Sequence, residues 1–144
     1  MTATDASPLS AGTGYRLIKL GEVLFSRAEQ ALIAFDVRPR HFNVLTTVAA
    51  DPTLSQRELS GKLGIDPNVM VGVIDELEAA GLARRQRSRS DRRRHIVVVT
   101  EAGHRLVAKG NAAVAEAERE FFAQLDRQEL RALHATAGRL LGLA

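Results

Sequence analysis

The stretch GLARRQRSRSDRRRHIVVVT, residues 81–100, predicts a β-hairpin with a basic tip. Leu82–Gln86 and His95–Thr100 are two extended runs, and the second contains four consecutive β-branched residues. From Arg84 to Arg94 there are seven arginines and one aspartate, so this segment carries a charge of +6 and the remaining residues sum to −3. A basic patch on a mildly acidic body is typical of a polyanion-binding site. A solvated or disordered arginine tract is the alternative interpretation.

Two short capped helices are predicted before this hairpin. The run Ser55–Glu58 matches a capping box, in which each of the two end side chains accepts from the other residue's backbone N–H. Gly64 is placed for a left-handed helix end. Asp66 and Pro67 suit the cap and the first position of the next helix, which Gly81 closes.

Longer helices are predicted on both sides of this region. Apolar residues at helical spacing predict a helix over about residues 15–36, while Thr100 and Asp126 are placed to cap helices within about 101–143. Two short helices and a hairpin between them predict a winged helix-turn-helix over about residues 39–100. The fold class we expect is mainly α with a small β-hairpin, a winged helix-turn-helix with long N- and C-terminal helices.

Composition excludes several classes of protein. The chain has no cysteine, which excludes disulfides, thiolate nucleophiles, zinc fingers and cysteine redox switches. No apolar run is long enough to cross a membrane. Residues 1–14 lack the basic start and apolar core of a secretory signal, so we expect a flexible arm and a cytoplasmic protein. Residues 15–144 are expected to form a single domain.

The second short helix is a candidate reader of DNA bases, because a helix fits the major groove. The residues expected to face the core are Val69, Val73, Ile74 and Leu77. The residues expected to face outward are Asn68, Val71, Gly72 and Asp75. An exposed asparagine can pair with adenine, an exposed valine can touch a thymine methyl group, and Gly72 would let the backbone approach closely. An ordinary surface of a small helix is the alternative.

The first turn of the preceding helix carries Gln56 and Arg57. Helix N-termini favour phosphate through free N–H groups and the helix dipole. Both residues are therefore candidates for contacts with the DNA backbone, although a generic first turn would look similar.

Residues 81–103 resemble the wing of the multiple-antibiotic-resistance regulator (MarR) family. That wing commonly reads as Gly-Leu, an arginine pair, a turn, Asp-Arg-Arg, a strand and then Leu-Thr-x-x-Gly. The counterparts here are Gly81-Leu82, Arg84-Arg85, Asp91-Arg92-Arg93 and Val99-Thr100-Glu101-Ala102-Gly103. Val99, where the family usually has leucine, is a mild departure. Leu54–Leu59 is similar to the opening of the family's third helix, and the element order agrees over nearly the whole chain after Gly14.

This resemblance implies a set of partners and roles. Asp91 would brace Arg93, which would enter the minor groove, and the long helices over about 15–36 and 101–143 would build a homodimer. The operator would be a pseudo-palindrome in double-stranded DNA, with half-sites about one helical turn apart. No cofactor and no metal are expected. The candidate DNA-binding residues are Gln56, Arg57, Asn68, Val71, Gly72, Arg85, Arg87, Arg89, Asp91, Arg92 and Arg93.

The resemblance also implies a small aromatic or phenolic effector. Tyr15, Arg16, His41 and Phe42 are the candidate ligand-binding residues, although for His41 alone the favoured interpretation is a capped or solvated residue near a helix start. The chain lacks the cysteine of peroxide-sensing members and the tryptophan typical of urate-responsive members, so neither sensing mode is assumed.

Two functions remain open from the sequence. The first is a DNA-binding regulator, expected to be a repressor. The second is a winged-helix module that binds an acidic protein partner through its arginine-rich hairpin. We do not expect an enzyme, because the chain has no glycine-rich phosphate loop, no metal-ligand spacing and no nucleophile beside a base.

Overall fold

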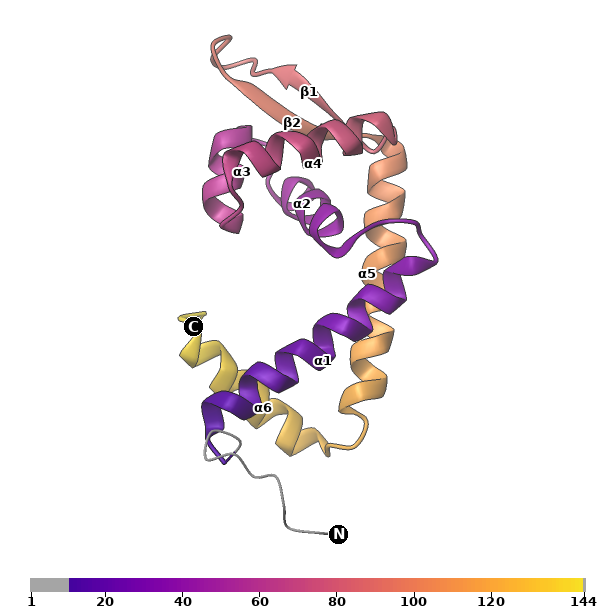
Figure 1. Ribbon diagram of the computed structural model, residues 1–144, viewed down its shortest axis with the longest axis vertical. Coiled ribbons are helices and arrows are strands. Elements are labelled where there is room, and N and C mark those ends of the chain that lie inside the picture. Colours follow the sequence, from indigo (N-terminus) through magenta and orange to yellow (C-terminus); the bar gives the residue numbers. More distant parts are fainter. Residues whose placement is uncertain (1–10, 144) are drawn as a thin grey trace. The chain divides into compact units, whose positions relative to one another are not determined.

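The computed structural model describes residues 11–143, which form six helices and one two-stranded hairpin (Figure 1). The elements are α1 (Thr13–Ile33), α2 (Pro39–Ala50), α3 (Gln56–Leu63), α4 (Pro67–Ala79), β1 (Ala83–Arg87), β2 (His95–Val99), α5 (Glu101–Phe122) and α6 (Arg127–Leu140). This confirms the predicted mainly α fold with a small hairpin. Most of the predicted N-terminal arm lies outside the described residues, and Thr13 and Gly14 already belong to α1.

The chain forms two compact units. One unit comprises the described residues up to 28 together with residues 114–143, and the other comprises residues 29–113. The second unit contains α2, α3, α4 and the hairpin, the elements of a winged helix-turn-helix, and it extends beyond residues 39–100 at both ends.

The hairpin, which we call the wing, is an antiparallel pair of strands. Ala83 pairs with Val99, Arg85 with Val97, and Arg87 with His95. Alternation along β2 turns Val97 and Val99 toward the core, and Ala83 is the buried residue of β1. Arg84 and Arg87 of β1 are exposed, whereas Arg85 is half-buried. The wing contacts α4 through β1 and α3 through β2.

The core of the winged-helix unit is aliphatic. Its fully buried members come from α2, α3, α4 and β2, which explains why the two short helices and the hairpin form one body. The buried residues of this core are Val44, Leu45, Val48, Leu54, Leu59, Met70, Val73, Ile74, Leu77, Ala83, Val97 and Val99.

The caps of α3 and α4 follow the sequence, with one exception. Gly64 ends α3 in the left-handed conformation at φ 65°, and the Asp66 carboxylate accepts a hydrogen bond from the Asn68 N–H at 2.8 Å. The Ser55 capping box is only half formed. The Ser55 hydroxyl accepts from the Glu58 N–H, but the Glu58 carboxylate accepts from that hydroxyl rather than from the serine backbone. Ser55 instead forms an isolated β-bridge with Ile96, which attaches the start of α3 to the wing.

The prediction that Val69 faces the core is wrong. Val69 is 42% exposed, whereas Met70 is completely buried. The buried residues of α4 repeat at intervals of three and four positions and so form one apolar stripe: Met70, Val73, Ile74 and Leu77. Position 69 lies outside this stripe.

The N-terminus of α6 has a complete capping box. The Asp126 carboxylate accepts from the Glu129 N–H at 2.8 Å, and the Glu129 carboxylate accepts from the Asp126 N–H at 3.0 Å. In the unit that contains α6, the Arg27 guanidinium lies 5.2 Å from the centroid of the Phe121 ring, within cation–π range. Across residues 11–143, no helix combines the length and the apolar character needed to span a bilayer.

Two glycines let the first part of α5 lie against the winged-helix core. A Cβ atom added at Gly103 would come within 2.6 Å of Val99 Cγ1 and closer still to the Leu82 carbonyl oxygen. A Cβ atom added at Gly110 would lie within 2.7 Å of the Phe42 ring. The two glycines are seven residues apart, so they share a face of α5. Both are buried, and a larger side chain has no space at either position.

We predict that Gly103→Ala destabilises the protein by about 1–3 kcal/mol, because a backbone carbonyl cannot move aside as a flexible side chain can. The measurement is urea unfolding followed by circular dichroism at fixed protein concentration. The matched control is Gly61→Ala in α3, where an added Cβ meets nothing within 4 Å. That control should gain about 0.5–1 kcal/mol from helix propensity, and equal losses in both variants would contradict the packing argument.

Candidate nucleic-acid interface

The outer face of α4 is exposed, uncharged over its first two turns and partly apolar. Asn68, Val71 and Gly72 are all exposed, and a Cβ atom at Gly72 would meet nothing within 4 Å. Val69, which sequence analysis placed in the core, joins this face and is as exposed as Val71. The signal that would have placed it correctly is the spacing of Met70 from Val73 and Ile74.

The tip of the wing is a turn organised by Asp91. Its side chain accepts from the Arg93 backbone N–H at 3.0 Å, and its backbone carbonyl accepts from the Arg94 N–H at 3.0 Å. The family pattern implied that Asp91 braces the Arg93 guanidinium, but the hydrogen bond observed is to the backbone. This contact fixes the turn and leaves the Arg93 guanidinium exposed.

Five arginines of the wing are exposed and have no ion-pair partner in the described part of the chain. Arg84 lies near the start of β1. We call the other four, Arg87, Arg89, Arg92 and Arg93, the tip arginines. Arg94 differs from them, because its guanidinium pairs with the Glu58 carboxylate on α3.

A concave surface joins the start of α3 to the wing. Its cavity has a volume of about 700 Å³ and is lined by Ser55, Gln56, Arg57, Glu58, Arg85, Arg93, Arg94 and His95. The fold therefore brings together four of the predicted DNA-binding residues from two elements. Arginine side chains and the free N–H groups of a helix start are the donors that a phosphate group accepts from.

Arg85 is bonded to the protein itself, unlike the tip arginines. Its Nε donates to Gln56 Oε1 at 2.9 Å, and one terminal nitrogen donates to the Val71 carbonyl at 3.2 Å. The other terminal nitrogen donates to Asp75 Oδ1 at 2.7 Å and to the Glu78 carboxylate. The sequence placed Arg85 among the DNA-binding residues, and its partners could not be identified there because they lie up to 29 positions away.

The four predicted ligand-binding residues belong to different units. Tyr15 and Arg16 are exposed on α1, while His41 and Phe42 are buried at the start of α2. The prediction that they form one site therefore stays a prediction. His41 is neither solvated nor a cap: its Nε2 lies 2.7 Å from Glu76 Oε2, and its Nδ1 is buried without a hydrogen-bond partner among the described residues.

His41 and Glu76 line a cavity of about 380 Å³ within the winged-helix unit. The remaining lining residues are Ile33, Asp36, Val37, Arg38, Leu77, Ala80 and Leu82. The mixture of apolar walls with a few charged groups suits a small organic molecule.

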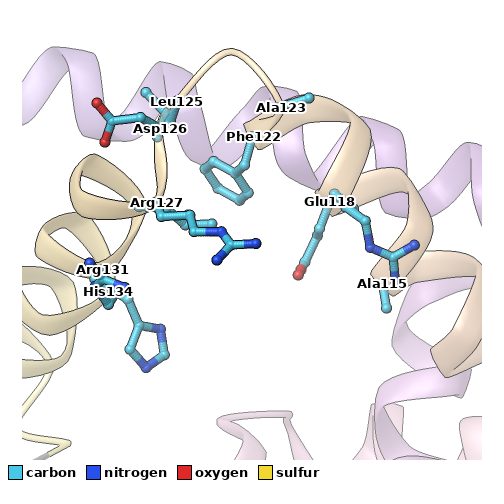
Figure 2. Close-up of a pocket in the computed structure, with 11 residues that line it drawn as sticks. Ala115, Glu118, Phe122, Ala123, Leu125, Asp126, Arg127, Arg131 and His134 are labelled. Carbon is cyan, nitrogen blue, oxygen red and sulfur yellow. The ribbon is translucent and has the colours of Figure 1, made fainter.

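A larger cavity, of about 900 Å³, lies between the end of α5 and α6 (Figure 2). Figure 2 shows the Phe122 ring and the Arg127 guanidinium pointing into it. Leu125, Leu130 and His134 contribute further walls. In residues 11–143 no group of three or more histidine, aspartate or glutamate side chains is arranged to hold a metal ion.

Comparison with known proteins gives the family. The family model described as MarR family matches residues 35–94. A putative transcriptional regulatory protein for the hcr operon of Thauera aromatica is 33% identical over 107 residues, which are 74% of this chain but only 60% of that protein. An HTH-type transcriptional repressor of Mycobacterium tuberculosis H37Rv is 30% identical over 131 residues, and the match covers 91% of each chain. These relatives are transcriptional regulators, not enzymes.

Solved structures agree with this assignment. The transcriptional repressor CouR, bound to a 23-mer DNA duplex, is 30% identical with a TM-score of 0.86, covering 97% of this chain and 99% of that one. CouR from Rhodococcus jostii RHA1, bound to p-coumaroyl-CoA, is 29% identical with a TM-score of 0.80 and covers 94% of this chain and 95% of that one. Since the sequence match, the fold and the wing pattern all coincide, the chain belongs to the MarR family of transcriptional regulators.

Proposed function

We propose that the protein is a transcriptional repressor that works in the cytoplasm and binds a pseudo-palindromic operator in double-stranded DNA as a homodimer. The observation that carries this proposal is the pairing, in one compact unit, of two features: a groove-sized helix whose exposed face is uncharged over its first two turns, and a wing whose tip arginines have no ion-pair partner among the described residues. The DNA complex of CouR, whose fold matches over 97% of this chain, supports it.

In this proposal α4 enters the major groove and the wing enters the adjacent minor groove. Asn68 would read adenine, and Val71, with Val69 beside it, would contact thymine methyl groups, while Gly72 lets the helix backbone approach the bases. Gln56 and Arg57 at the start of α3 would hold phosphates. The tip arginines would occupy the minor groove, with Asp91 fixing the turn that presents them.

The homodimer is supported by apolar side chains that one chain leaves in water. On α1, Ile18 and Phe25 are 64% and 60% exposed. At the end of α6 and beyond, Leu140, Leu141 and Leu143 are each 72% exposed. The cavity between α5 and α6, in the same unit, also has apolar walls (Figure 2). Large exposed apolar residues gathered on one unit mark a surface that binds protein, and a second copy is the partner proposed here.

Two variants separate the proposed roles of the wing and of α4, which we call the reading helix. We predict that Arg93→Ala weakens binding about tenfold on any duplex, because the variant cannot form a charge-assisted hydrogen bond with the DNA. Asn68→Ala should instead narrow the ratio between the affinities for a selected and a scrambled duplex. Fluorescence anisotropy on a duplex selected by the wild-type protein from a randomised library measures both. For the wild-type protein, a plot of log K against log salt concentration should have a slope steeper than about −4.

A flat salt dependence, or failure to select any duplex at low salt, would contradict DNA binding. Either result would favour the alternative function, a winged-helix module whose arginines bind an acidic protein.

For the dimer, we predict that the wild-type protein has twice the chain mass in size-exclusion chromatography with light scattering. Leu140→Glu should raise the dimer dissociation constant about 10–100-fold, because each copy loses a buried leucine. Gln128→Glu, which adds the same charge at an exposed polar position of α6, is the control. A monomeric wild-type protein that still binds its operator tightly would overturn the dimer proposal.

We further propose that a small aromatic or phenolic ligand releases the protein from DNA. CouR binds the phenolic thioester p-coumaroyl-CoA. In this chain the cavity beside His41 and Glu76 joins α2 to α4, so a molecule bound there would act directly on the reading helix.

The test adds p-coumarate and p-coumaroyl-CoA separately to the complex between the protein and its selected duplex. We predict that at least one of them lowers the bound fraction in a saturable way, and calorimetry without DNA should then show a matching affinity. The absence of any effect from both compounds at millimolar concentration would contradict a phenolic effector.

A further inference from the structure

We propose that Arg85 is a positioning residue that locks the reading helix to the wing, and that it makes no contact with DNA. This inference rests on the proposed function, because it assigns a role within the same DNA-binding unit. It separates Arg85 from the tip arginines, with which the sequence pattern groups it.

The hydrogen bonds of Arg85 occupy nearly all of its donors. A guanidinium group has five N–H bonds in a fixed fork. Four of them are directed at Gln56, Asp75, Glu78 and the Val71 carbonyl oxygen. The side chain is only 25% exposed. One remaining N–H cannot grip a phosphate in the bidentate manner that makes arginine a strong phosphate ligand.

These partners connect three elements. Gln56 opens α3, while Val71, Asp75 and Glu78 follow one another along α4. Arg85 itself is on β1, where its backbone N–H also donates to the Glu78 carboxylate at 3.2 Å. A single side chain therefore fixes the angle at which α4 is presented beside the wing. Binding then costs less conformational entropy, because the two DNA-contacting elements are already held in register.

The contact also balances charge. Asp75 is 61% exposed and lies on the same side of α4 as Val71, so an unpaired carboxylate there would repel the phosphates that flank a groove. The Arg85 guanidinium lies against both Asp75 and Glu78 and offsets one of the two negative charges.

Lysine should not replace arginine in this role. A lysine ammonium group carries the same charge but lacks the planar fork that reaches four acceptors on two helices. At a simple phosphate contact, by contrast, lysine is an adequate point charge. The pair of substitutions Arg85→Lys and Arg85→Ala therefore separates the two roles.

The experiment measures affinity against salt concentration for the wild-type protein and three variants, on the duplex that the wild-type protein selects and on a scrambled duplex. The variants are Arg85→Lys, Arg85→Ala and the comparator Arg87→Ala. Arg87 lies two residues along the same strand and is exposed. Circular dichroism confirms at the assay temperature that each variant is folded.

We expect Arg85→Ala to weaken binding to the selected duplex about ten- to hundredfold and to narrow the ratio between the affinities for the selected and the scrambled duplex. The salt slope should change less than it does in Arg87→Ala, because no phosphate contact is lost. Arg85→Lys should behave similarly, with a smaller loss. Arg87→Ala should instead lower the magnitude of the slope by about 0.9 for each phosphate that the variant no longer neutralises. A mere loss of folded protein would not change the ratio between the affinities for the two duplexes.

The proposal is overturned if Arg85→Ala reduces the salt slope as Arg87→Ala does, or if Arg85→Lys binds like the wild type. If Arg85→Ala does not fold, the affinity of Arg85→Lys decides the question alone. Failure of the wild-type protein to select any duplex would instead overturn the proposed function, and with it this inference.

Discussion

The division of the wing arginines between protein partners and solvent is the constraint on which the DNA-binding unit depends. Glu58 on α3 pairs with Arg94, and Asp75 and Glu78 on α4 pair with Arg85. These contacts hold the hairpin against the two short helices. The tip arginines keep no such partner among the described residues and remain exposed. The wing is therefore anchored by Arg85 and Arg94 and presents the charges of the tip arginines.

Local chemistry made much of this fold predictable. Gly64, Asp66 and Asp126 act at helix ends through contacts with neighbours a few residues away, so their roles can be inferred from spacing alone. The hairpin could also be predicted from the sequence, because its two extended runs flank a stretch of arginine, serine and aspartate that cannot form a core. The order of the elements, and with it the winged-helix class, follows from these local signals.

The features that could not be predicted depend on tertiary contacts. The backbone of Ser55 forms a β-bridge with that of Ile96, 41 positions away in the chain, and its capping box forms only in part. Arg85 looks like any other arginine of the tract until Gln56 and Asp75 are placed beside it. Val69 and Met70 are adjacent and both apolar, and only the stripe completed by Leu77 decides which of them is buried.

The surface of α4 fits the proposed division, in which the wing supplies affinity and α4 supplies specificity. Its exposed face carries an asparagine and two valines but no cation over its first two turns, so it adds little long-range attraction to DNA. In the proposed function the attraction resides in the wing and in the start of α3, where exposed charges are screened over about 8 Å at physiological salt. Because hydrogen bonds and methyl contacts act only at contact distance, α4 would discriminate between sequences only after the arginines have docked. The proposed anchoring of β1 to α4 would thus decide whether a non-specific attraction becomes a sequence-specific one.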